Sequence, residues 1–446
     1  MKGLIFRIVK RITPSFLYES FKKIYQFTHI LFIKRKIQIF QKNQAKAIEK
    51  VRGKRKIRVA FLLIHESVWK YDEIYRLMAE DNRFEPIVIV CPYTPYGEEV
   101  MQMEMNKAYN SFKKKGFNVV KTIKEENGKM LDIKNEVKPD LIFFTSPYSL
   151  TEKKYTILNF KEYLTFYVPY GYMITDRPEM QYNQILHNLV YKVFYESIFH
   201  KGQAYDHSTN KGQNSIVTGY PGLDPFLSPN KVVLENTWKN KNRKLKRIIW
   251  APHHTIEPEN TQFNYSNFLE YYNFFLEIAE KYEDKIIISF KPHPILRAKL
   301  NKHYDWGEEK TNNYYKEWEK RNNCQLDEGD YIDLFNTSDA MIHDSGSFLT
   351  EYICTNKPSL YMIRHNLLLS GFSKLGDNII DCHYKSHSKE DIEAFIKEVV
   401  IEGNDYLKTK RESLIHNYLL PPVGKNASQN IINEIFGIIG NKITQL

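Results

Sequence analysis

Cysteine is scarce in this chain and follows no recognisable pattern. The four cysteines lie far apart and form no CxxC pair: Cys91, Cys324, Cys354 and Cys382. This spacing argues against a zinc site or a disulfide framework and favours a reducing, cytoplasmic compartment. With 446 residues and 42% hydrophobic content, the chain can bury large cores, and we expect two domains.

Long hydrophobic runs are also missing. The longest nearly apolar run, 27–33, contains His29 and is far too short to span a bilayer. The start of the sequence has neither the long apolar core nor the small-residue cleavage site of a secretory signal. We therefore expect neither a membrane-spanning helix nor secretion.

Acidic residues are nearly absent from the first 56 positions. This arm holds sixteen Lys or Arg and only two acids, Glu19 and Glu49. The formal net charge of +11 therefore originates in the arm, and the remainder of the chain is slightly acidic. Because no recognised nucleic-acid-binding module surrounds the arm, we expect no nucleic acid partner.

Apolar residues recur at helical spacing within the arm, at Phe21, Ile24, Phe27 and Leu31, with Lys and Arg among and beyond them. A basic amphipathic helix of this kind can lie in the headgroup region of an anionic membrane, where apolar burial and electrostatic attraction add. The alternative is a helix that packs on its own domain and exposes a solvated basic face. The first interpretation places the protein peripherally on the inner face of the cell membrane.

Beyond the arm, strands and helices alternate. Short apolar runs predict strands at 57–64, 86–91, 117–120, 140–145, 164–168, 247–252, 285–290, 339–343 and 358–362. Because helical patterns separate many of them, we expect parallel pairing through right-handed crossovers. The segment 215–224 combines a further strand with a Gly/Pro-rich break, and we expect the domain boundary there.

The predicted fold class is therefore α/β, with two doubly wound, Rossmann-like domains. The expected divisions are a basic arm at 1–55, an N-terminal domain at 56–218, a C-terminal domain at 219–425, and a helix at 426–446 that could pack back on the N-terminal domain.

Polar clusters follow three strands of the second half. They read Pro-His-His-Thr at 252–255, Lys-Pro-His-Pro at 291–294 and His-Asp-Ser-Gly-Ser at 343–347. The carboxyl ends of parallel strands meet at one edge of a sheet, where a single ligand can contact all three clusters. The third cluster also opens a predicted helix, and backbone N–H groups at such a turn can approach an anion. Taken alone, it could equally be an ordinary turn with Ser347 as N-cap.

The residue types favour an anion over a metal ion. His253 and His254 are adjacent, so they cannot both face one ion from an extended strand, and no HExxH motif is present. Lys291, Arg297 and the 345–347 turn instead suit a pyrophosphate, because cations and N–H donors stabilise charge on a leaving phosphate. We therefore expect no metal and no certain cofactor.

Together, these clusters resemble a known family. Residues 251–255, 291–294 and 343–347, preceded by 218–224, are similar to the CDP-glycerol glycerophosphotransferase family, whose members make teichoic-acid and related polyol-phosphate polymers on membrane lipid carriers. The resemblance covers roughly residues 215–365. It implies a GT-B fold of two domains facing a cleft, with the donor nucleotide on the C-terminal domain and the acceptor on the N-terminal one.

Carried over by position, the resemblance assigns roles to individual residues. His293, Asp344 and His254 would be the catalytic residues, with His293 in contact with the donor diphosphate. Glu351 would bind the ribose of the donor. The other donor-binding residues would be Lys291, Arg297, Thr255, Ser345, Gly346 and Ser347.

The acceptor side departs from the family pattern. Members typically carry a His-Gly pair after an N-domain strand, with the histidine as general base, whereas this chain has Tyr170 and Gly171. A neutral tyrosine titrates near pH 10 and is a poor base at neutral pH. Either Asp176, His187 or His200 serves as the base, or the donor and acceptor differ from those of the best-known members.

The resulting prediction is a transferase that moves glycerol phosphate or ribitol phosphate from a CDP-polyol donor to a lipid-linked glycan or polymer acceptor and releases CMP. It would act in cell-wall or capsule polysaccharide biosynthesis, with an anionic membrane surface as a further partner. Two alternatives stay open. One is a GT-B glycosyltransferase that uses a nucleotide sugar for capsule or lipopolysaccharide assembly, and the other is a non-catalytic, membrane-associated scaffold.

Overall fold

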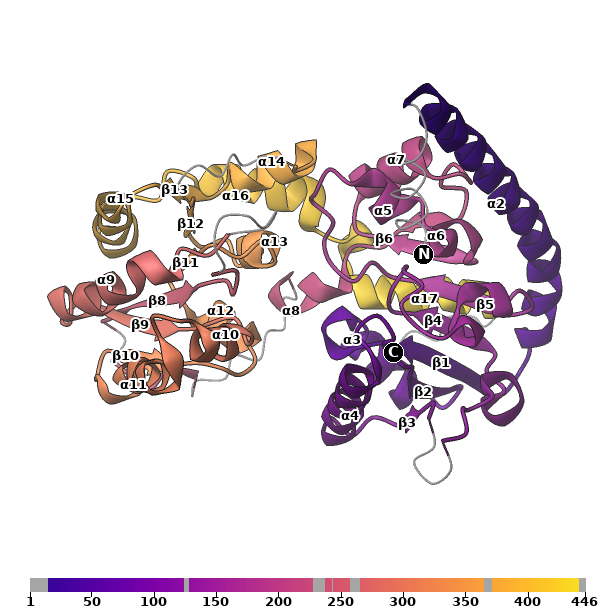
Figure 1. Ribbon diagram of the computed structural model, residues 1–446, viewed down its shortest axis with the longest axis horizontal. Helices are drawn as coiled ribbons and strands as arrows, with labels where there is room; N and C mark the ends of the chain where they lie inside the picture. The colour runs from indigo at the N-terminus through magenta and orange to yellow at the C-terminus, as the bar shows by residue number, and fades with distance from the viewer. Residues whose placement is uncertain are drawn as a thin grey trace. The chain divides into compact units, whose positions relative to one another are not determined.

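The computed structural model describes residues 15–123, 128–227, 237–242, 244–256, 265–364 and 371–440. The chain forms two compact units, which we describe separately (Figure 1). Unit 1 comprises Met1–Tyr170, Pro178–Gly219 and Ser428–Leu446, and unit 2 comprises Gly171–Arg177 and Tyr220–Ala427. Each unit is built on one parallel β-sheet, so the predicted α/β class with two doubly wound sheets is confirmed.

Unit 1 contains a seven-stranded sheet of order β3-β2-β1-β4-β5-β6-β7, in which every pairing is parallel. Its strands are β1 (Ile57–Leu63), β2 (Phe84–Val90), β3 (Val119–Lys121), β4 (Leu141–Phe144), β5 (Leu164–Tyr167), β6 (Lys192–Tyr195) and β7 (Ser215–Val217). Every residue of β1 except Arg58 is buried. A parallel strand covered on both faces reads as a continuous apolar run, which is the pattern that predicted β1.

The helices of unit 1 connect and flank these strands. They are α2 (Ser15–Val51), α3 (Asp72–Glu80), α4 (Glu98–Lys114), α5 (Pro178–Tyr182), α6 (Ile185–Leu189), α7 (Ile198–His207) and α17 (Ala427–Ile439). On α17, the ring of Phe436 packs at 5.7 Å from the ring of Phe84 and lies under the guanidinium of Arg83. Helix α17 thus contacts the start of β2.

From residue 15 onward, the arm forms the long helix α2, which packs against α6 and β5 (Figure 1). Ile33, Phe40 and Ala47 are buried, and their spacing of seven residues places them on one face of the helix. Ile24 and Leu31 remain 64% and 49% exposed. Among the described residues, no helix is both long and apolar enough to cross a membrane.

Unit 2 contains a six-stranded parallel sheet of order β10-β9-β8-β11-β12-β13. Its strands are β8 (Lys246–Ala251), β9 (Ile286–Phe290), β10 (Cys324–Leu326), β11 (Ala340–His343), β12 (Ser359–Met362) and β13 (Tyr384–Ser386). Its helices are α8 (Asp224–Leu227), α9 (Phe268–Lys281), α10 (Leu296–Lys302), α11 (Gly307–Lys320), α12 (Ile332–Thr337), α13 (Phe348–Ile353), α14 (Lys374–Ile380), α15 (Lys389–Ala394) and α16 (Lys408–Leu414).

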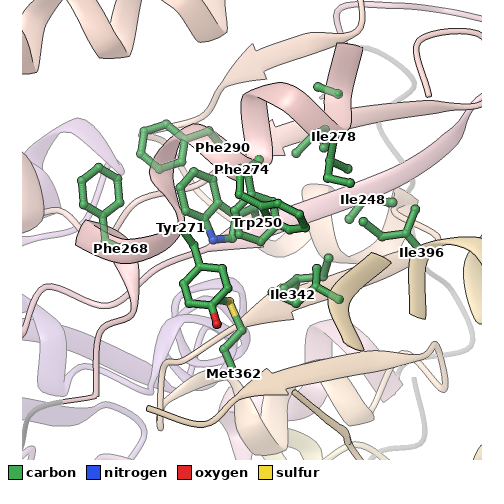
Figure 2. Close-up of a cluster of buried hydrophobic side chains, with 14 of the residues drawn as sticks. Ile248, Trp250, Phe268, Tyr271, Phe274, Ile278, Phe290, Ile342, Met362 and Ile396 are labelled. Carbon is green, nitrogen blue, oxygen red and sulfur yellow. The ribbon is translucent and has the colours of Figure 1, made fainter. Parts of the chain in front are cut away.

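The core of unit 2 surrounds Trp250 on β8 (Figure 2). Its indole stacks on Phe275 of α9 at 4.1 Å and on Phe290 of β9 at 4.9 Å. Phe268 and Ile278, on the same helix, are buried too, as expected for an amphipathic helix on a sheet. This packing fixes β8 and β9 side by side, so the ends of both strands are held at a defined separation.

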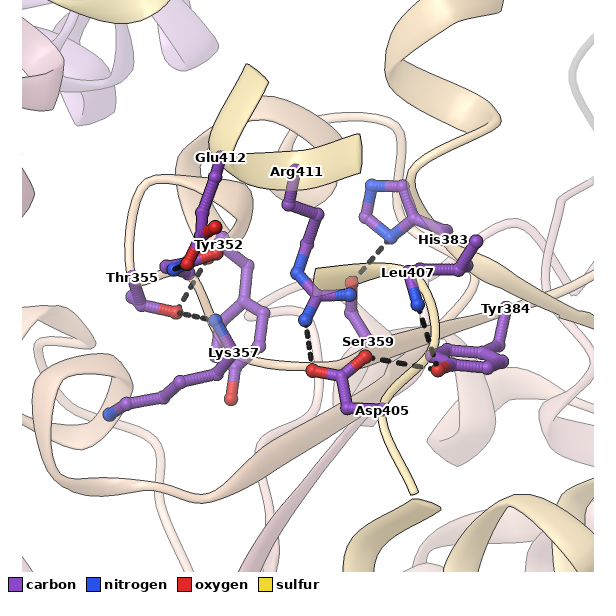
Figure 3. Close-up of polar contacts among 11 residues, drawn as sticks. Tyr352, Thr355, Lys357, Ser359, His383, Tyr384, Asp405, Leu407, Arg411 and Glu412 are labelled. Atoms are coloured by element: carbon purple, nitrogen blue, oxygen red, sulfur yellow. Dashed lines mark hydrogen bonds and ion pairs between the residues drawn. The ribbon is translucent and has the colours of Figure 1, made fainter. Parts of the chain in front are cut away.

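Polar contacts tie the C-terminal part of unit 2 to its sheet (Figure 3). Arg411 on α16 is fully buried and forms an ion pair with Asp405, which also accepts a hydrogen bond from the hydroxyl of Tyr384 on β13 at 3.0 Å. On the neighbouring strand β12, Ser359 lies 2.6 Å from Nδ1 of His383. These contacts anchor the edge strand β13, which is only three residues long.

A short segment before α5 belongs to unit 2. Asp176 donates its backbone N–H to the carbonyl of Gly371 at 2.7 Å, and Ser373 donates to the carbonyl of Ile174 at 2.8 Å. A Cβ atom on Gly376 would come within 2.3 Å of that same carbonyl of Ile174. Glycine is therefore required at this point of α14 for the close approach of the two segments.

Three strands were not predicted, namely β6, β10 and β13. They are three or four residues long and include polar residues such as Lys192, Gln325 and Lys385. Other strands of this length, such as the wholly apolar β4, were predicted, so it is the polar residues in these three strands that interrupt the recognisable pattern.

Candidate active site

The site in unit 2 begins with Asp344, which directly follows β11. Its carboxylate accepts the backbone N–H of His253 through Oδ1 and the backbone N–H of Asn267 through Oδ2, each at 2.6 Å. Asp344 therefore joins the end of β8 to the start of α9. Burial raises the pKa of the Asp344 carboxyl to about 6, although these hydrogen bonds lower it. The arrangement makes Asp344 a positioning residue for the loop after β8.

Three imidazoles meet at the adjacent ends of β8 and β9. The ring centroids of His254 and His293 are 4.3 Å apart, and the ring of His253 lies 4.3 Å from that of His254 and 5.2 Å from that of His293. All three side chains are half-buried. The predicted convergence of the clusters after these two strands is thus present in the structure, and it also includes His253, which the sequence analysis did not select as a site residue.

Backbone geometry explains how adjacent histidines share one region. Strand β8 ends at Ala251, and the chain bends at His254. Side chains at 253 and 254 are therefore not forced to opposite faces, as they would be in an extended strand. The premise on which the sequence analysis excluded a shared ligand for this pair is wrong.

Hydrogen bonds assign the protonation of His293. The backbone N–H of Ile295 donates to Nδ1 of His293 at 3.2 Å, so the proton of the neutral ring must reside on Nε2. Burial, followed by the neighbouring His254 and Lys299, lowers the pKa of His293 to about 4. At neutral pH this side chain is an uncharged Nε2–H donor.

Thr255 supports the same loop. Its hydroxyl oxygen accepts the backbone N–H of Tyr265 at 2.9 Å and lies 3.0 Å from Nδ1 of His253. The side chain therefore orients an imidazole and links both ends of the segment between 255 and 265. Contact with a donor, as the resemblance implied for Thr255, stays a prediction.

The two predicted cations are engaged with one acidic loop. The ammonium of Lys291 lies 3.1 Å from Oδ1 of Asp327 and donates to the carbonyl of Gly329 at 2.6 Å. Arg297 forms an ion pair with Glu328 at 3.2 Å. Both side chains therefore brace the loop after β10, and direct contact with a diphosphate stays a prediction.

The turn between β11 and α13 presents small residues to open space. Ser345 is buried, Ser347 is exposed, and a Cβ atom on Gly346 would meet nothing within 4 Å. Beneath the turn, Nδ1 of the fully buried His343 contacts the carbonyl of Ser345 at 3.1 Å. Burial lowers the pKa of His343 to about 3, so it supports the turn as a neutral side chain.

Glu351 lies on α13, one turn after Ser347, and is 8% exposed. Burial and the nearby Glu351 carboxylate raise the pKa of Tyr331. Tyr331 was not predicted as a site residue, because a tyrosine before a short helix matches no sequence motif for a functional site.

The residues suggested for the acceptor side are not gathered in one unit. Tyr170 belongs to unit 1, where its hydroxyl lies 3.3 Å from that of Tyr148, whereas Gly171 and Asp176 belong to unit 2. His187 and His200 are buried in unit 1. Two phenols at neighbouring strand ends, of β4 and β5, are therefore the polar feature around Tyr170.

His187 and His200 each have a local structural role. Nδ1 of His187 accepts the backbone N–H of Gln184 in a capping box at the start of α6. Burial lowers the pKa of His187 to about 3. Nδ1 of His200 lies 2.8 Å from the hydroxyl of Ser197 and 3.9 Å from the carboxylate of Glu196.

Comparison with solved structures identifies the type of fold. Similar solved structures include a UDP-N-acetylglucosamine 2-epimerase, with a TM-score of 0.54 and 14% identity over 88% of this chain and 98% of that chain. The corresponding enzyme from Neisseria meningitidis has a TM-score of 0.53 and 13% identity over 86% and 100%. A variant of the wall teichoic acid polymerase TagF has a TM-score of 0.54 and 12% identity over 95% and 98%. At these identities the likeness establishes the GT-B-like fold alone.

A family model matches part of the sequence. The model described as CDP-Glycerol:Poly(glycerophosphate) glycerophosphotransferase matches residues 168–365, which include all three strand-end clusters. The predicted resemblance to this family is confirmed over these residues, and the chain is an enzyme, a transferase similar to the members of that family. No curated protein sequence matches the chain.

Proposed function

We propose that the enzyme transfers glycerol phosphate or ribitol phosphate from a CDP-polyol to a hydroxyl group of a lipid-linked glycan or polymer, and releases CMP, in the synthesis of a cell-wall or capsule polymer. The observation that carries this proposal is the convergence of His254 and His293. Both residues, and the open turn at 345–347 after β11, lie within the part of the chain that the family model matches.

The reaction requires stabilisation of negative charge. The acceptor oxygen attacks the phosphorus that bears the polyol, the bond from that phosphorus to the oxygen of CMP breaks, and the hydroxyl proton passes to a base or to solvent. A phosphate leaving group has a second pKa of about 6, so CMP can depart as an anion without being protonated. Groups that hold the diphosphate oxygens therefore matter more than a general acid.

His293 fits such a role. Its Nε2–H is a neutral donor fixed by the hydrogen bond from Ile295, and a donor held in place before the reaction needs no reorganisation as charge develops. With a pKa of about 4, it is not a source of protons at neutral pH. The backbone N–H groups of the open turn at 345–347 would hold further phosphate oxygens, and Glu351 would accept a hydrogen bond from the ribose.

Asp344 contributes at one remove from the substrate. It holds the backbone of His253 and Asn267 and so fixes the loop that carries His254. The catalytic role that the resemblance implied for Asp344 is therefore proposed to be one of positioning. On the acceptor side we propose that Tyr170 and Tyr148 bind the attacking hydroxyl group or its neighbours, since neutral phenols donate and accept hydrogen bonds without being ionised.

A direct test is incubation of the purified chain with CDP-glycerol or CDP-ribitol and a lipid-linked acceptor analogue. CMP release that requires the acceptor is the expected result. Release of UDP from a nucleotide sugar, with no CMP from either CDP-polyol, would instead establish the glycosyltransferase alternative. Thermal stabilisation by CDP or CMP separates both enzymes from a scaffold without a working site, because a ligand that binds only the folded state raises the melting temperature.

We propose in addition that α2 holds the enzyme on an anionic membrane surface. Ile33 is buried, and by helical geometry Ile24 and Leu31 lie on the opposite face of α2 from it. The exposed apolar residues thus point away from the rest of unit 1. Lysines and arginines at 34–36 follow on the same helix, and each basic residue near anionic lipid contributes about 1 kcal/mol.

Replacing Ile24, Phe27 and Leu31 together by serine should weaken binding to anionic vesicles at least tenfold. Burial of each apolar side chain in the interface contributes about 1.5–3 kcal/mol of binding free energy. The matched control is Tyr304→Ser, since Tyr304 is 88% exposed in unit 2. Vesicle co-sedimentation at low and high salt is the measurement. Unchanged binding of the triple variant would contradict the anchoring role.

A further inference from the structure

The imidazoles of His253, His254 and His293 form a cluster with a second chemical capacity. Each side chain offers one ligand nitrogen, and the three nitrogens lie within 4.8 Å of one another. We propose that this cluster binds one divalent transition-metal ion of the zinc class. The proposal does not depend on the proposed transferase function, because an ion can bind the three rings in the absence of any nucleotide.

The ligand set decides which metals are expected. Imidazole nitrogens suit Zn²⁺, Co²⁺, Ni²⁺ and Cu²⁺, whereas Mg²⁺ and Ca²⁺ prefer oxygen ligands. Three histidines with a remaining open position are a ligand set of known zinc sites, with metal–nitrogen distances of about 2.0–2.1 Å. The nitrogens of such a site lie roughly 3.4 Å apart, so the rings must close by about 1 Å. Half-buried side chains can make this movement by rotation.

A supporting contact is already in place. The hydroxyl oxygen of Thr255 lies 3.0 Å from Nδ1 of His253 and is itself fixed by the backbone N–H of Tyr265. Metal-binding histidines generally have their second nitrogen held by a hydrogen-bonding partner, which sets the ring orientation. The contact with Thr255 therefore restricts the orientation of the His253 ring within the cluster. Asp344 fixes the backbone of the same residue.

Metal binding by His293 requires the loss of a hydrogen bond. Its Nδ1 accepts the 3.2 Å hydrogen bond from Ile295, so coordination through Nε2 moves the ring proton to Nδ1 and breaks that bond. A hydrogen bond of this kind is worth about 1 kcal/mol net, which is small beside metal–imidazole bonding. The surrounding charges include the carboxylate of Asp344, which favours a cation, and the ammonium of Lys299, which opposes one.

The experiment is a titration of the full-length, tag-free chain with Zn²⁺ alone, followed by calorimetry, and with Co²⁺, followed by visible absorption. We expect one ion per chain and the intense visible bands of four-coordinate Co²⁺. His253→Ala, His254→Ala and His293→Ala should each weaken binding at least tenfold. His387→Ala and His416→Ala, which alter exposed histidines elsewhere, are the matched controls and should leave the affinity unchanged.

Thr255→Val provides a variant in which all three rings remain. It should weaken Zn²⁺ binding by about tenfold, as the loss of a hydrogen-bonding partner of a metal ligand generally does. Melting temperatures of all variants verify that they are folded. Affinity that is equal in the wild type and the three alanine variants, or Co²⁺ without four-coordinate bands, would overturn the proposal. CMP release by a chain that binds no ion would leave the transferase function standing while this inference fails.

Discussion

The two units share a doubly wound parallel topology, yet the carboxyl ends of their strands are occupied differently. In unit 2, His254 and His293 follow neighbouring strands, and their ring centroids are 4.3 Å apart. Asp344 follows β11, on the other side of β8, and holds the loop that carries His254. In unit 1, the hydroxyl group of Tyr170 meets another phenol, that of Tyr148, at 3.3 Å. A strand end becomes a candidate site where adjacent strands deliver complementary groups to the same place.

The largest effect is expected for His293, whose removal tests whether the edge of unit 2 is the chemical centre. His293→Ala should lower kcat/KM for the CDP-polyol by roughly 10²–10³, the loss observed when one fixed donor to a developing anion is removed. His293→Gln, which keeps an N–H donor, should recover part of the activity. Steady-state CMP release is the measurement, and melting temperature is the control. A large drop in melting temperature would show that His293 is structural instead.

Asp344 tests whether that edge depends on its positioning residue. Asp344→Asn leaves the N–H of His253 or of Asn267 facing an amide NH₂ group, and an unsatisfied buried donor costs about 1–3 kcal/mol. We expect a comparable loss in the free energy of unfolding, measured by urea denaturation, together with weaker nucleotide binding. Asp333→Asn, which alters a carboxylate on α12, is the matched control. Unchanged stability would contradict the hydrogen-bonding role of Asp344.

Acid should destabilise both units, because each buries a neutral histidine. Burial lowers the pKa of His187 in unit 1 and of His343 in unit 2 to about 3, below the ordinary value near 6.5. The stability they contribute is present above pH 6.5 and is lost as the pH falls toward 3, because only the unfolded state takes up the protons. Asp344, with its pKa raised to about 6, works in the opposite direction below pH 6.

We therefore expect the melting temperature to fall from pH 6.5 to pH 4. His343→Asn keeps an N–H donor for the carbonyl of Ser345 but does not titrate, so this variant should show a shallower fall. Differential scanning calorimetry across this pH range is the measurement. An equally steep fall in the variant would mean that His343 is not a source of the acid sensitivity.

The smallest effect is expected on the acceptor side. Tyr170→Phe removes one hydroxyl from the pair with Tyr148, and kcat should fall by less than about tenfold, since a neutral phenol is not an effective base. Tyr148→Phe should behave alike, with the change in the KM for the acceptor and not for the donor. A loss of a thousandfold would show that Tyr170 is the general base after all, and would remove the contrast between the two units.

Much of the fold could be read from the sequence because its long strands are covered on both faces. Runs such as 57–64 and 285–290 are apolar throughout, and parallel sheets require this. The strands β6, β10 and β13 could not be predicted, because polar residues interrupt their short apolar patterns. The helical arm was predicted from its periodicity. The burial of Ile33, Phe40 and Ala47, with Ile24 exposed, depends on the packing of α2 against α6, which periodicity does not specify.

The candidate site was predicted in composition but not in arrangement. Sequence order placed His293 and Asp344 after parallel strands, and parallel strands share an edge by geometry. It did not disclose that Lys291 and Arg297 would face Asp327 and Glu328, since ion pairs between distant segments depend on how loops pack.

What the sequence by itself determined is the periodicity of the strands, the basic arm, and the identity of the groups at each strand end, because these follow from local residue order. The tertiary structure alone decided which of those groups meet. The bend after β8 brings His253 and His254 to the same side as His293, and the close packing around Gly376 assigns Asp176 to unit 2. Both outcomes depend on contacts between residues far apart in the chain, which residue order does not specify.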